Sequence, residues 1–271
     1  MTLAAQDPIG LFDSGIGGLS IMKEIRRLLP YEDLIYVADS KFCPYGEKSA
    51  QAIQERSRKI TRFLLDQNVK LIVVACNTAS IAALTQLRAE YSVPFVGVEP
   101  AVKQAALFTK KKKIGVLATG LALSGERFTF LVEKFAEGLT VVSQACPGLV
   151  EQVEKGALNG PETEALLRRY LEPLAEKGVD VVVLGCTHYP FLRPLVEKLV
   201  QPGVRVIDTG APVARQTRRV LMEAELISPR TERGREWFYT SGDPSVVGPV
   251  IERLWGSRGK GVARLPAAFL E

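Results

Sequence analysis

Short runs of apolar residues alternate along the chain with longer segments in which apolar positions recur at a helical period. The apolar runs are rich in β-branched side chains and bounded by Gly, Pro, Asp or Lys, a pattern typical of buried strands. We predict strands at 9–12, 34–38, 71–75, 95–98, 114–118, 179–185, 204–207 and 237–240. Helices are predicted at 19–29, 50–65, 80–90, 126–135, 163–176, 195–200 and 213–226. Because the strands are almost continuously apolar, both of their faces must be covered, which predicts an α/β fold of parallel sheets flanked by helices.

Two stretches of the first half of the chain are repeated in the second half. Segment 9–15 (IGLFDSG) matches 114–120 (IGVLATG), and segment 73–78 (VVACNT) matches 183–188 (VLGCTH), at offsets of 114 − 9 = 105 and 186 − 76 = 110 residues. Chance similarity between apolar strands explains the valines, but not the cysteines and hydroxyl residues at matched strand ends. We therefore predict two similar doubly wound parallel-sheet domains related by internal pseudo-symmetry, with the active site in the cleft between them.

Polar residues follow the predicted strands, at the carboxyl ends where parallel α/β sheets bind ligands. They are Asp13, Ser14, Asp39, Ser40, Cys76, Asn77, Thr78, Thr119, Cys186, Thr187 and His188. The glycine-rich segment 13–18 (DSGIGG) lacks the spacing of a dinucleotide fingerprint, and no Gly-Lys-Ser/Thr follows it as in a P-loop. Two interpretations stay open: a loop whose backbone amides bind a small anion, or a tight turn from strand to helix.

The composition narrows the possible chemistry, because the 271 residues include four cysteines and one histidine. A zinc site would need nearly all of them, no Cys-x-x-Cys pair exists to start one, and we expect no metal. A Ser-His-Asp triad would have to use His188. Four cysteines make a poor disulfide framework for a chain of this length, so we interpret them as thiols in a reducing cytoplasm. The length itself predicts about two domains.

Charge and hydropathy give no sign of a membrane or nucleic-acid partner. The N-terminus has no basic or long apolar stretch typical of an export signal, and apolar runs such as 71–76 are too short to span a bilayer. The net charge is +5. No aromatic residue interleaves the basic run Lys110–Lys113, so we interpret it as a solvated turn and expect no nucleic-acid binding.

Cys76 and Cys186 occupy the most informative positions, one in each copy of the repeat. A cysteine between a strand and a helix lies in the positive field of the helix N-terminus, which lowers a thiol pKa from about 8.5. Simple burial and a disulfide between them are the alternatives. Cys43 and Cys146 have no counterpart in the other copy and are interpreted as packing residues.

The surroundings of the two thiols differ between the copies. His188, two residues after Cys186, could tune or protonate that thiol, because an imidazole titrates near neutral pH. Asp13 has Ala118 as its counterpart, so one copy alone supplies a carboxylate, which would polarise Cys76. Two thiols with different support suit a reaction that removes a proton from one face of a chiral carbon and returns one to the other. Hydroxyls and backbone amides would hold the carboxylates of the substrate.

Several motifs together resemble those of the glutamate racemase family, cofactor-independent enzymes of the aspartate/glutamate racemase fold. They are 12–19 (FDSGIGGL), 38–39 with 44–46 (AD and PYG), 75–80 (ACNTAS), 185–190 (GCTHYP) and 240–243 (TSGD). The resemblance runs from Ile9 to about Trp255, nearly the whole chain. It implies interconversion of L- and D-glutamate without a cofactor, supplying D-glutamate for bacterial peptidoglycan and thereby for the cell wall and cell shape. It also implies a cytoplasmic homodimer.

The resemblance also implies roles for individual residues. Cys76 would be the base for the D-enantiomer and Cys186 the base for the L-enantiomer. Asp13, His188 and Glu154 would assist the thiols. The substrate would contact Asp13, Ser14, Tyr45, Gly46, Asn77, Thr78, Thr187 and His188.

The chain departs from the family pattern at a few positions. Gly148 and Glu151 stand where we expect Leu and Pro, which puts the register of Glu154 in question. Ala122 replaces a threonine that usually follows Thr119, which puts one hydroxyl contact in question.

The resemblance predicts a first domain of residues 1–99 with 211–271 and a second domain of residues 100–210. Two other functions stay open. One is an aspartate racemase-like activity on the same fold, and the other is a non-catalytic regulatory protein that acts on DNA topology through its basic surface.

Overall fold

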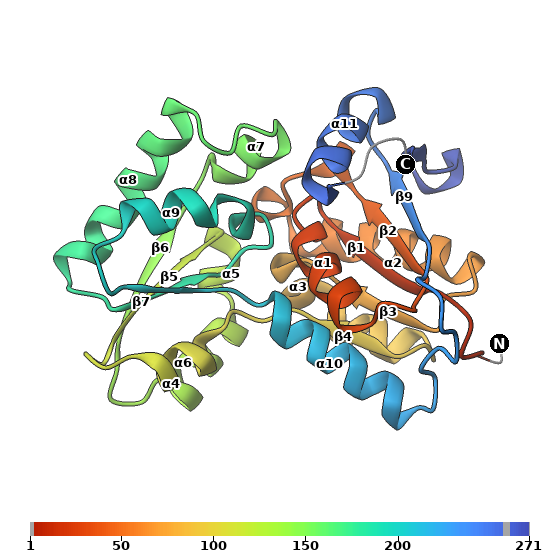
Figure 1. The fold of residues 1–271 in the computed structure, drawn as a ribbon, viewed down its shortest axis with the longest axis horizontal. Coiled ribbons are helices and arrows are strands. Elements are labelled where there is room, and N and C mark those ends of the chain that lie inside the picture. Colours follow the sequence, from red (N-terminus) through yellow and green to blue (C-terminus); the bar gives the residue numbers. More distant parts are fainter. Residues whose placement is uncertain (1–2, 257–260, 271) are drawn as a thin grey trace. The chain divides into compact units, whose positions relative to one another are not determined.

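The computed structural model describes residues 3–256 and 261–270, which form two parallel β-sheets in two units (Figure 1). Unit 1 comprises Met1–Val98 and Gly210–Glu271, and unit 2 comprises Glu99–Thr209. None of the helices in the described ranges is long and apolar enough to cross a membrane. The α/β fold with parallel sheets is as the hydrophobic pattern predicts.

The sheet of unit 1 has the strand order β10-β9-β2-β1-β3-β4, and every adjacent pair is parallel. Its strands are β1 (Ile9–Asp13), β2 (Leu34–Ala38), β3 (Leu71–Val74), β4 (Phe95–Gly97), β9 (Glu236–Thr240) and β10 (Ala263–Arg264). In the register, Asp13 lies beside Ala38, and Phe12 lies between Val37 and Val74. The carboxyl ends of β1, β2 and β3 therefore meet at one edge.

Helices cover both faces of this sheet, and α1, α2 and α10 each turn one apolar stripe inward. The helices are α1 (Leu19–Leu28), α2 (Ala50–Asp66), α3 (Asn77–Glu90), α10 (Gly210–Glu223) and α11 (Pro244–Trp255). α1 packs against α10 and α11, while α2 packs against α3 (Figure 1). In α1 the buried positions Leu19, Met22 and Ile25 recur at the spacing of one helix face.

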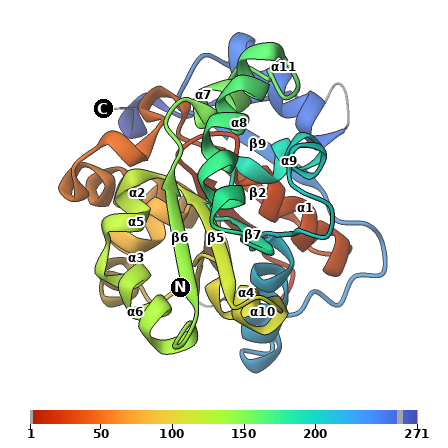
Figure 2. The same cartoon turned by 90° about the vertical axis from the view of Figure 1, so that its left-hand side faces the viewer.

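The sheet of unit 2 has the order β6-β5-β7-β8, again fully parallel, and Figure 2 shows β6, β5 and β7 side by side. Its strands are β5 (Lys113–Ala118), β6 (Thr140–Ala145), β7 (Val181–Leu184) and β8 (Arg205–Ile207). Its helices are α4 (Val102–Phe108), α5 (Gly120–Ser124), α6 (Glu126–Phe135), α7 (Leu149–Glu154), α8 (Pro161–Glu176) and α9 (Arg193–Leu199). The order repeats β2-β1-β3-β4 of unit 1, which confirms the predicted repeat.

Two strands are absent from the prediction. β6 is an edge strand whose residues are exposed or half-buried, so it lacks the continuous apolar run of a buried strand. β10 has two residues, too few for a pattern. The short helices α4, α5 and α7, each of five to seven residues, are absent from the predicted ranges, because they make less than two turns of periodicity. The twelve-residue helix α11 is absent from them as well, because Gly248 and Pro249 interrupt its pattern.

The basic run Lys110–Lys113 is exposed, as expected of a solvated turn. Asp180 organises this turn: its carboxylate accepts hydrogen bonds from the Thr109 hydroxyl (2.5 Å) and from the backbone N–H groups of Lys110 (2.7 Å) and Lys111 (2.8 Å). Burial alone would raise the pKa of Asp180, but these hydrogen bonds outweigh it and lower the pKa below its usual value.

Candidate active site

Cys76 lies directly after β3 and caps the N-terminus of α3. Its Sγ accepts a hydrogen bond from the backbone N–H of Ala79 at 3.4 Å, and its side chain is almost fully buried. Its extended backbone (φ −141°, ψ 123°) is usual for a residue that precedes a helix. A helix N-terminus and a donated N–H both stabilise negative charge on sulfur. Both groups can therefore stabilise the negative charge that appears on this sulfur when the thiol loses its proton.

Asp13 and Ser14 connect the end of β1 to this thiol. Cys76 Sγ lies 3.9 Å from the Ser14 hydroxyl, which in turn lies 3.3 Å from Asp13 Oδ1. Asp13 is fully buried. The three side chains form a chain of polar contacts that begins at a carboxylate and ends at sulfur.

The glycine-rich segment is a tight turn closed around Asp13. The Asp13 carboxylate accepts hydrogen bonds from the backbone N–H groups of Ser14 and Gly18, both at 2.7 Å. A Cβ at Gly18 would lie 2.9 Å from Ala75 Cβ, from Asp13 Cβ and from the Tyr36 hydroxyl, so only glycine fits there. These two amides bind the protein's own carboxylate, so of the two interpretations the structure favours the tight turn.

Asn77 presents an unusual feature within the described part of the chain. Its side chain is 4% exposed, yet neither its Oδ1 nor its Nδ2 atom has a hydrogen-bond partner there. A buried amide without partners is costly, and a bound ligand or water is one way to satisfy it. Asn77 begins α3 immediately after Cys76, and Thr78, also buried, follows in the same helical turn. The amide can therefore bind a polar ligand beside the thiol.

Tyr45 lies in a 3₁₀ turn (Tyr45–Glu47), and its hydroxyl is already engaged. It donates a 2.5 Å hydrogen bond to Oδ2 of Asp39, the buried residue that follows β2. Burial raises the pKa of Tyr45 well above its usual value, and the charges of Asp39 and Cys76 raise it further. The hydroxyl proton is therefore not available to a substrate, whereas the backbone of the turn at Tyr45 and Gly46 offers further polar groups.

In unit 2, Cys186 occupies the place that Cys76 has in unit 1, but its support is different. Cys186 Sγ lies 3.7 Å from His188 Nδ1, and His188 Nε2 lies 2.6 Å from Oε1 of Glu154 at the end of α7. Because a carboxylate accepts, Nε2 carries a proton, and the neutral ring then offers the lone pair of Nδ1 to the thiol. His188 is 1% exposed. The arrangement can take the Cys186 proton and spread the resulting positive charge toward Glu154.

The other predicted residues of unit 2 also lie at strand ends. Thr187, which lies between Cys186 and His188 in the sequence, is buried. Thr119 follows β5 and caps α5, where its Oγ1 accepts a hydrogen bond from the N–H of Ala122 at 3.4 Å. A Cβ at Gly185 would lie 2.9 Å from the Leu117 carbonyl oxygen, so a glycine brings the strand before Cys186 close to β5.

The remaining two cysteines differ from this pair. Cys146, after β6, is buried, and its thiol donates to the carbonyl of Gln144 at 3.2 Å. Burial raises the pKa of Cys146 strongly, and the nearby charge of Cys186 adds to the effect, so Cys146 stays a neutral thiol as expected of a packing residue. Cys43 is half-buried.

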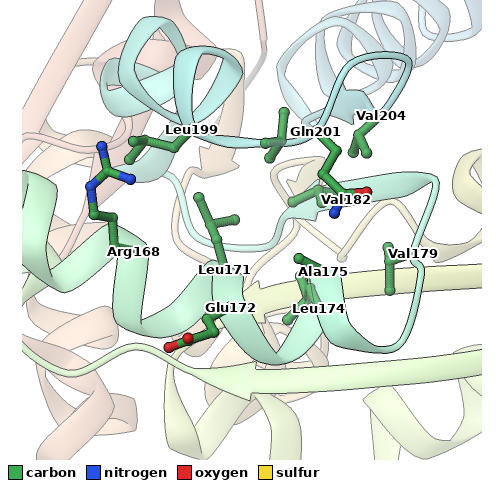
Figure 3. Close-up of a pocket in the computed structure, with 11 residues that line it drawn as sticks. Arg168, Leu171, Glu172, Leu174, Ala175, Val179, Val182, Leu199, Gln201 and Val204 are labelled. Carbon is green, nitrogen blue, oxygen red and sulfur yellow. The ribbon is translucent and has the colours of Figure 1, made fainter.

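A hollow of about 390 Å³ lies in unit 2 between α8 and the residues that precede β8 (Figure 3). Leu171, Leu174, Val179 and Val204 make its lining largely apolar. It lies toward the amino ends of β7 and β8, whereas Cys186 follows the carboxyl end of β7. The hollow is therefore separate from the residues that can move a proton.

The structure thus gathers Asp13, Ser14, Asn77 and Thr78 about the first thiol, and His188 and Glu154 about the second.

Asp39 and Arg56 form a buried pair that the sequence does not predict, because the pattern places Asp39 at a strand end without a role and gives Arg56 none. Arg56 binds Asp39 with two hydrogen bonds, from Nε to Oδ2 at 3.0 Å and from Nη2 to Oδ1 at 2.9 Å. Arg56 lies at helical spacing from the apolar residues Ile53 and Ile60. A charged residue on such a stripe is the sequence signal that could have identified it.

Comparison with known proteins bears directly on this site. The family model described as "Asp/Glu/Hydantoin racemase" matches residues 9–217, which include both thiols and their neighbours. The chain belongs to this racemase family. A glutamate racemase of Methylococcus capsulatus is 48% identical over 264 residues, which cover 97% of each chain.

Solved structures of racemases have the same fold. A glutamate racemase isoform of Bacillus anthracis superposes with a TM-score of 0.89 at 31% identity, covering 97% of this chain and 99% of the other. A glutamate racemase of Escherichia coli, solved with L-glutamate and the activator UDP-MurNAc-ala, gives a TM-score of 0.84 at 34% identity, covering 95% and 98%.

Proposed function

We propose that the protein is a glutamate racemase that interconverts L- and D-glutamate by two thiols acting as acid and base. The observation that carries this proposal is the paired placement of Cys76 and Cys186. Each follows the third strand, in chain order, of the four-strand arrangement that the two sheets share, and each has polar neighbours able to stabilise a thiolate or take up a proton. Membership of the racemase family supports the same reaction class.

In the proposed mechanism, a thiolate on one face of the substrate takes the α-proton, and the electron pair of the C–H bond moves into the α-carboxylate. The thiol on the other face then gives its proton to the α-carbon, so the configuration inverts and the two sulfurs exchange protonation states. We assign Cys76 to the D-enantiomer and Cys186 to the L-enantiomer. The reverse reaction restores the starting states, so no net proton is consumed.

The polar residues around the thiols have distinct proposed roles. The unpartnered amide of Asn77 would bind a carboxylate or the amino group of glutamate, together with Ser14, Thr78, Thr187 and the backbone at Tyr45 and Gly46. Hydrogen bonds to the α-carboxylate stabilise the charge that develops there in the transition state. Asp13 would support Cys76 through Ser14, and Glu154 would support Cys186 through His188.

We further propose that the product D-glutamate serves peptidoglycan synthesis in the cytoplasm, where thiols stay reduced, and that the protein acts as a homodimer. Sedimentation analysis of the purified protein tests the dimer: we expect twice the mass of the 29.7 kDa chain. A single species of 29.7 kDa at working concentrations would contradict it.

The activity is tested by incubating dialysed protein with L-glutamate in D₂O and following both the optical rotation and the α-proton signal. We expect loss of rotation together with deuterium at the α-carbon, without added pyridoxal phosphate. L-Aspartate is the matched control substrate, and we expect much slower turnover. Equal turnover of aspartate would overturn the glutamate assignment, and no exchange with either acid would overturn the racemase proposal.

A further inference from the structure

The buried guanidinium of Arg56 joins two parts of unit 1 that lie far apart in sequence. Arg56 is on α2, and besides both oxygens of Asp39 it binds the backbone carbonyl of Phe269, to which Nη2 donates at 2.9 Å. Its side chain is 6% exposed and lies over the ring of Phe42, 4.0 Å from the ring centroid. The partners of the guanidinium thus include the Asp39 carboxylate, the Phe269 carbonyl and the ring of Phe42.

Phe269 belongs to a C-terminal segment (residues 263–270) that is attached to the same region by several contacts. β10 pairs with β9, Lys41 Nζ donates to the Leu270 carbonyl at 3.1 Å, and the ring of Phe269 packs edge-on against Phe63 at 5.5 Å. Phe63 lies on α2, two turns after Arg56. The segment is thus held against α2 by both backbone and ring contacts.

At its other end, this network reaches the turn that carries Tyr45. Asp39 receives both Arg56 and the Tyr45 hydroxyl, so one carboxylate holds the guanidinium and the phenol together. The turn contacts α3, the helix that begins beside Cys76, and the charge of Cys76 affects the pKa of Tyr45. Arg56, Asp39 and Tyr45 therefore form one continuous chain of contacts that ends at the Tyr45–Gly46 turn.

We propose that Arg56 is a positioning residue through which the C-terminal segment fixes the Tyr45–Gly46 turn for substrate binding. The inference rests on the proposed function, because it assigns this turn to the glutamate site. A planar guanidinium fits the role, since it binds two carboxylate oxygens and a carbonyl at once. Lysine keeps the charge but cannot make this set of contacts.

The test compares Arg56→Lys, Phe269→Ala and the double variant in the full-length chain. Arg58→Lys is the matched control on α2, because Arg58 pairs with Glu90 at the surface. Ala268→Ser is the matched control in the C-terminal segment, because Ala268 is exposed. Thermal unfolding of each variant monitors folding, and two readouts follow: steady-state kinetics with both enantiomers, and hydrogen–deuterium exchange of the peptide spanning 41–49.

For Arg56→Lys we expect the KM for L- and D-glutamate to rise about tenfold while kcat changes less than threefold, and amides 45–48 to exchange faster. Phe269→Ala should act in the same direction but more weakly. The double variant should match Arg56→Lys rather than the sum of the two effects, because both changes break the same connection between the C-terminal segment and the Tyr45–Gly46 turn. Both controls should behave as wild type.

Three results would overturn the inference: wild-type KM and wild-type exchange of 45–48 in Arg56→Lys, additive effects in the double variant, or an equal KM increase in Arg58→Lys. A loss of thermal stability with unchanged exchange at 45–48 would also overturn it, since it would show a purely structural role. If wild type itself does not racemise glutamate, the proposed function fails, and exchange at 45–48 still reports whether Arg56 fixes the turn.

Discussion

The two thiols occupy the same position in two copies of one sheet, yet their partners differ in kind. Cys76 has a helix amide, a hydroxyl and, behind the hydroxyl, a carboxylate that is fixed by two backbone amides. Cys186 has an imidazole that is backed by Glu154. The first environment is made of backbone amides, a hydroxyl and a carboxylate, and the second of an imidazole and a carboxylate.

This difference shows how a repeated unit can provide two unlike bases. The strand order and the position of the cysteine are set by the shared pattern of apolar residues, whereas the support comes from residues that the copies do not share. Asp13 has Ala118 as its counterpart, and His188 has Thr78. In unit 1 the turn after the first strand closes on Asp13, while in unit 2 the carboxylate arrives from α7 instead.

The largest expected effect is the loss of either thiol. Cys76→Ser and Cys186→Ser should each lower kcat for racemisation by about 10³-fold or more, because a hydroxyl is far too weak an acid or base for this proton transfer. Cys146→Ser, at the third buried cysteine, is the matched control and should keep most of the activity. A Cys76 or Cys186 variant with near wild-type kcat would remove that thiol from the proposed mechanism.

Replacing the side chains that support each thiol should show that Cys76 and Cys186 depend on different neighbours. His188→Gln should lower kcat/KM by about 10²-fold, because no group remains to exchange a proton with Cys186. Glu154→Gln, which keeps the imidazole, should cost about tenfold. Ser14→Ala should cost about tenfold or less, because the amide of Ala79 still supports Cys76.

The primary isotope effect of α-deuterated substrate identifies which thiol each change affects. It should rise for L-glutamate in His188→Gln, where removal of the proton by Cys186 becomes slower. It should rise for D-glutamate in Ser14→Ala. An increase for the same enantiomer in both variants would contradict the assignment of one thiol to each enantiomer.

Glycine substitutions test the structural side of the comparison. Gly18→Ala places a Cβ 2.9 Å from atoms of Asp13, Tyr36 and Ala75, so we expect a loss of about 1–3 kcal/mol in the free energy of unfolding. Gly120→Ala, at the start of α5 in unit 2, is the matched control, because no atom lies within 4 Å of the added Cβ. Urea denaturation of both variants measures the difference. Equal stability of the two variants would show that the turn around Asp13 is less tightly packed than described.

The smallest effect concerns the basic turn of unit 2. The pKa of Asp180 is lowered in the folded protein, so its ionised form stabilises the fold above the usual carboxyl pKa near 3.8, and this is lost as pH falls through the lower folded value. Asp180→Asn should therefore cost about 0.5 kcal/mol or less at pH 7, and the difference should shrink below pH 4. Thermal unfolding from pH 3 to pH 7 measures it. A difference that grows at low pH would contradict the assigned direction.

Much of the fold could be predicted because its central strands are buried on both faces. β1, β3, β5 and β7 stand out as continuous apolar runs, and the cysteines that follow β3 and β7 are matched by the repeat. β6 lacks this pattern because it lies at an edge. The repeat offered the missing signal, since β6 takes the place in unit 2 that β2 takes in unit 1.

The contacts within the candidate site were harder to predict, because they depend on residues that are distant in sequence. Glu154 reaches His188 across 34 residues from a six-residue helix, and Arg56 reaches Phe269 across 213. The sequence also does not show that the buried Asn77 amide has no hydrogen-bond partner among the described residues, because this depends on the packing around it. Sequence patterns identify which residues carry the chemistry, and packing decides which of them meet.

The central claim, one base for each enantiomer from each copy of the repeat, is tested most directly by α-hydrogen exchange in D₂O with variants that retain a single thiol. Each enantiomer is incubated separately with Cys76→Ala and with Cys186→Ala, and deuterium at the α-carbon is measured by mass spectrometry. We predict that neither variant inverts the substrate, that residual exchange in Cys76→Ala occurs with L-glutamate, and that residual exchange in Cys186→Ala occurs with D-glutamate. Exchange of the opposite enantiomer in either variant, or inversion by a single thiol, would contradict the account.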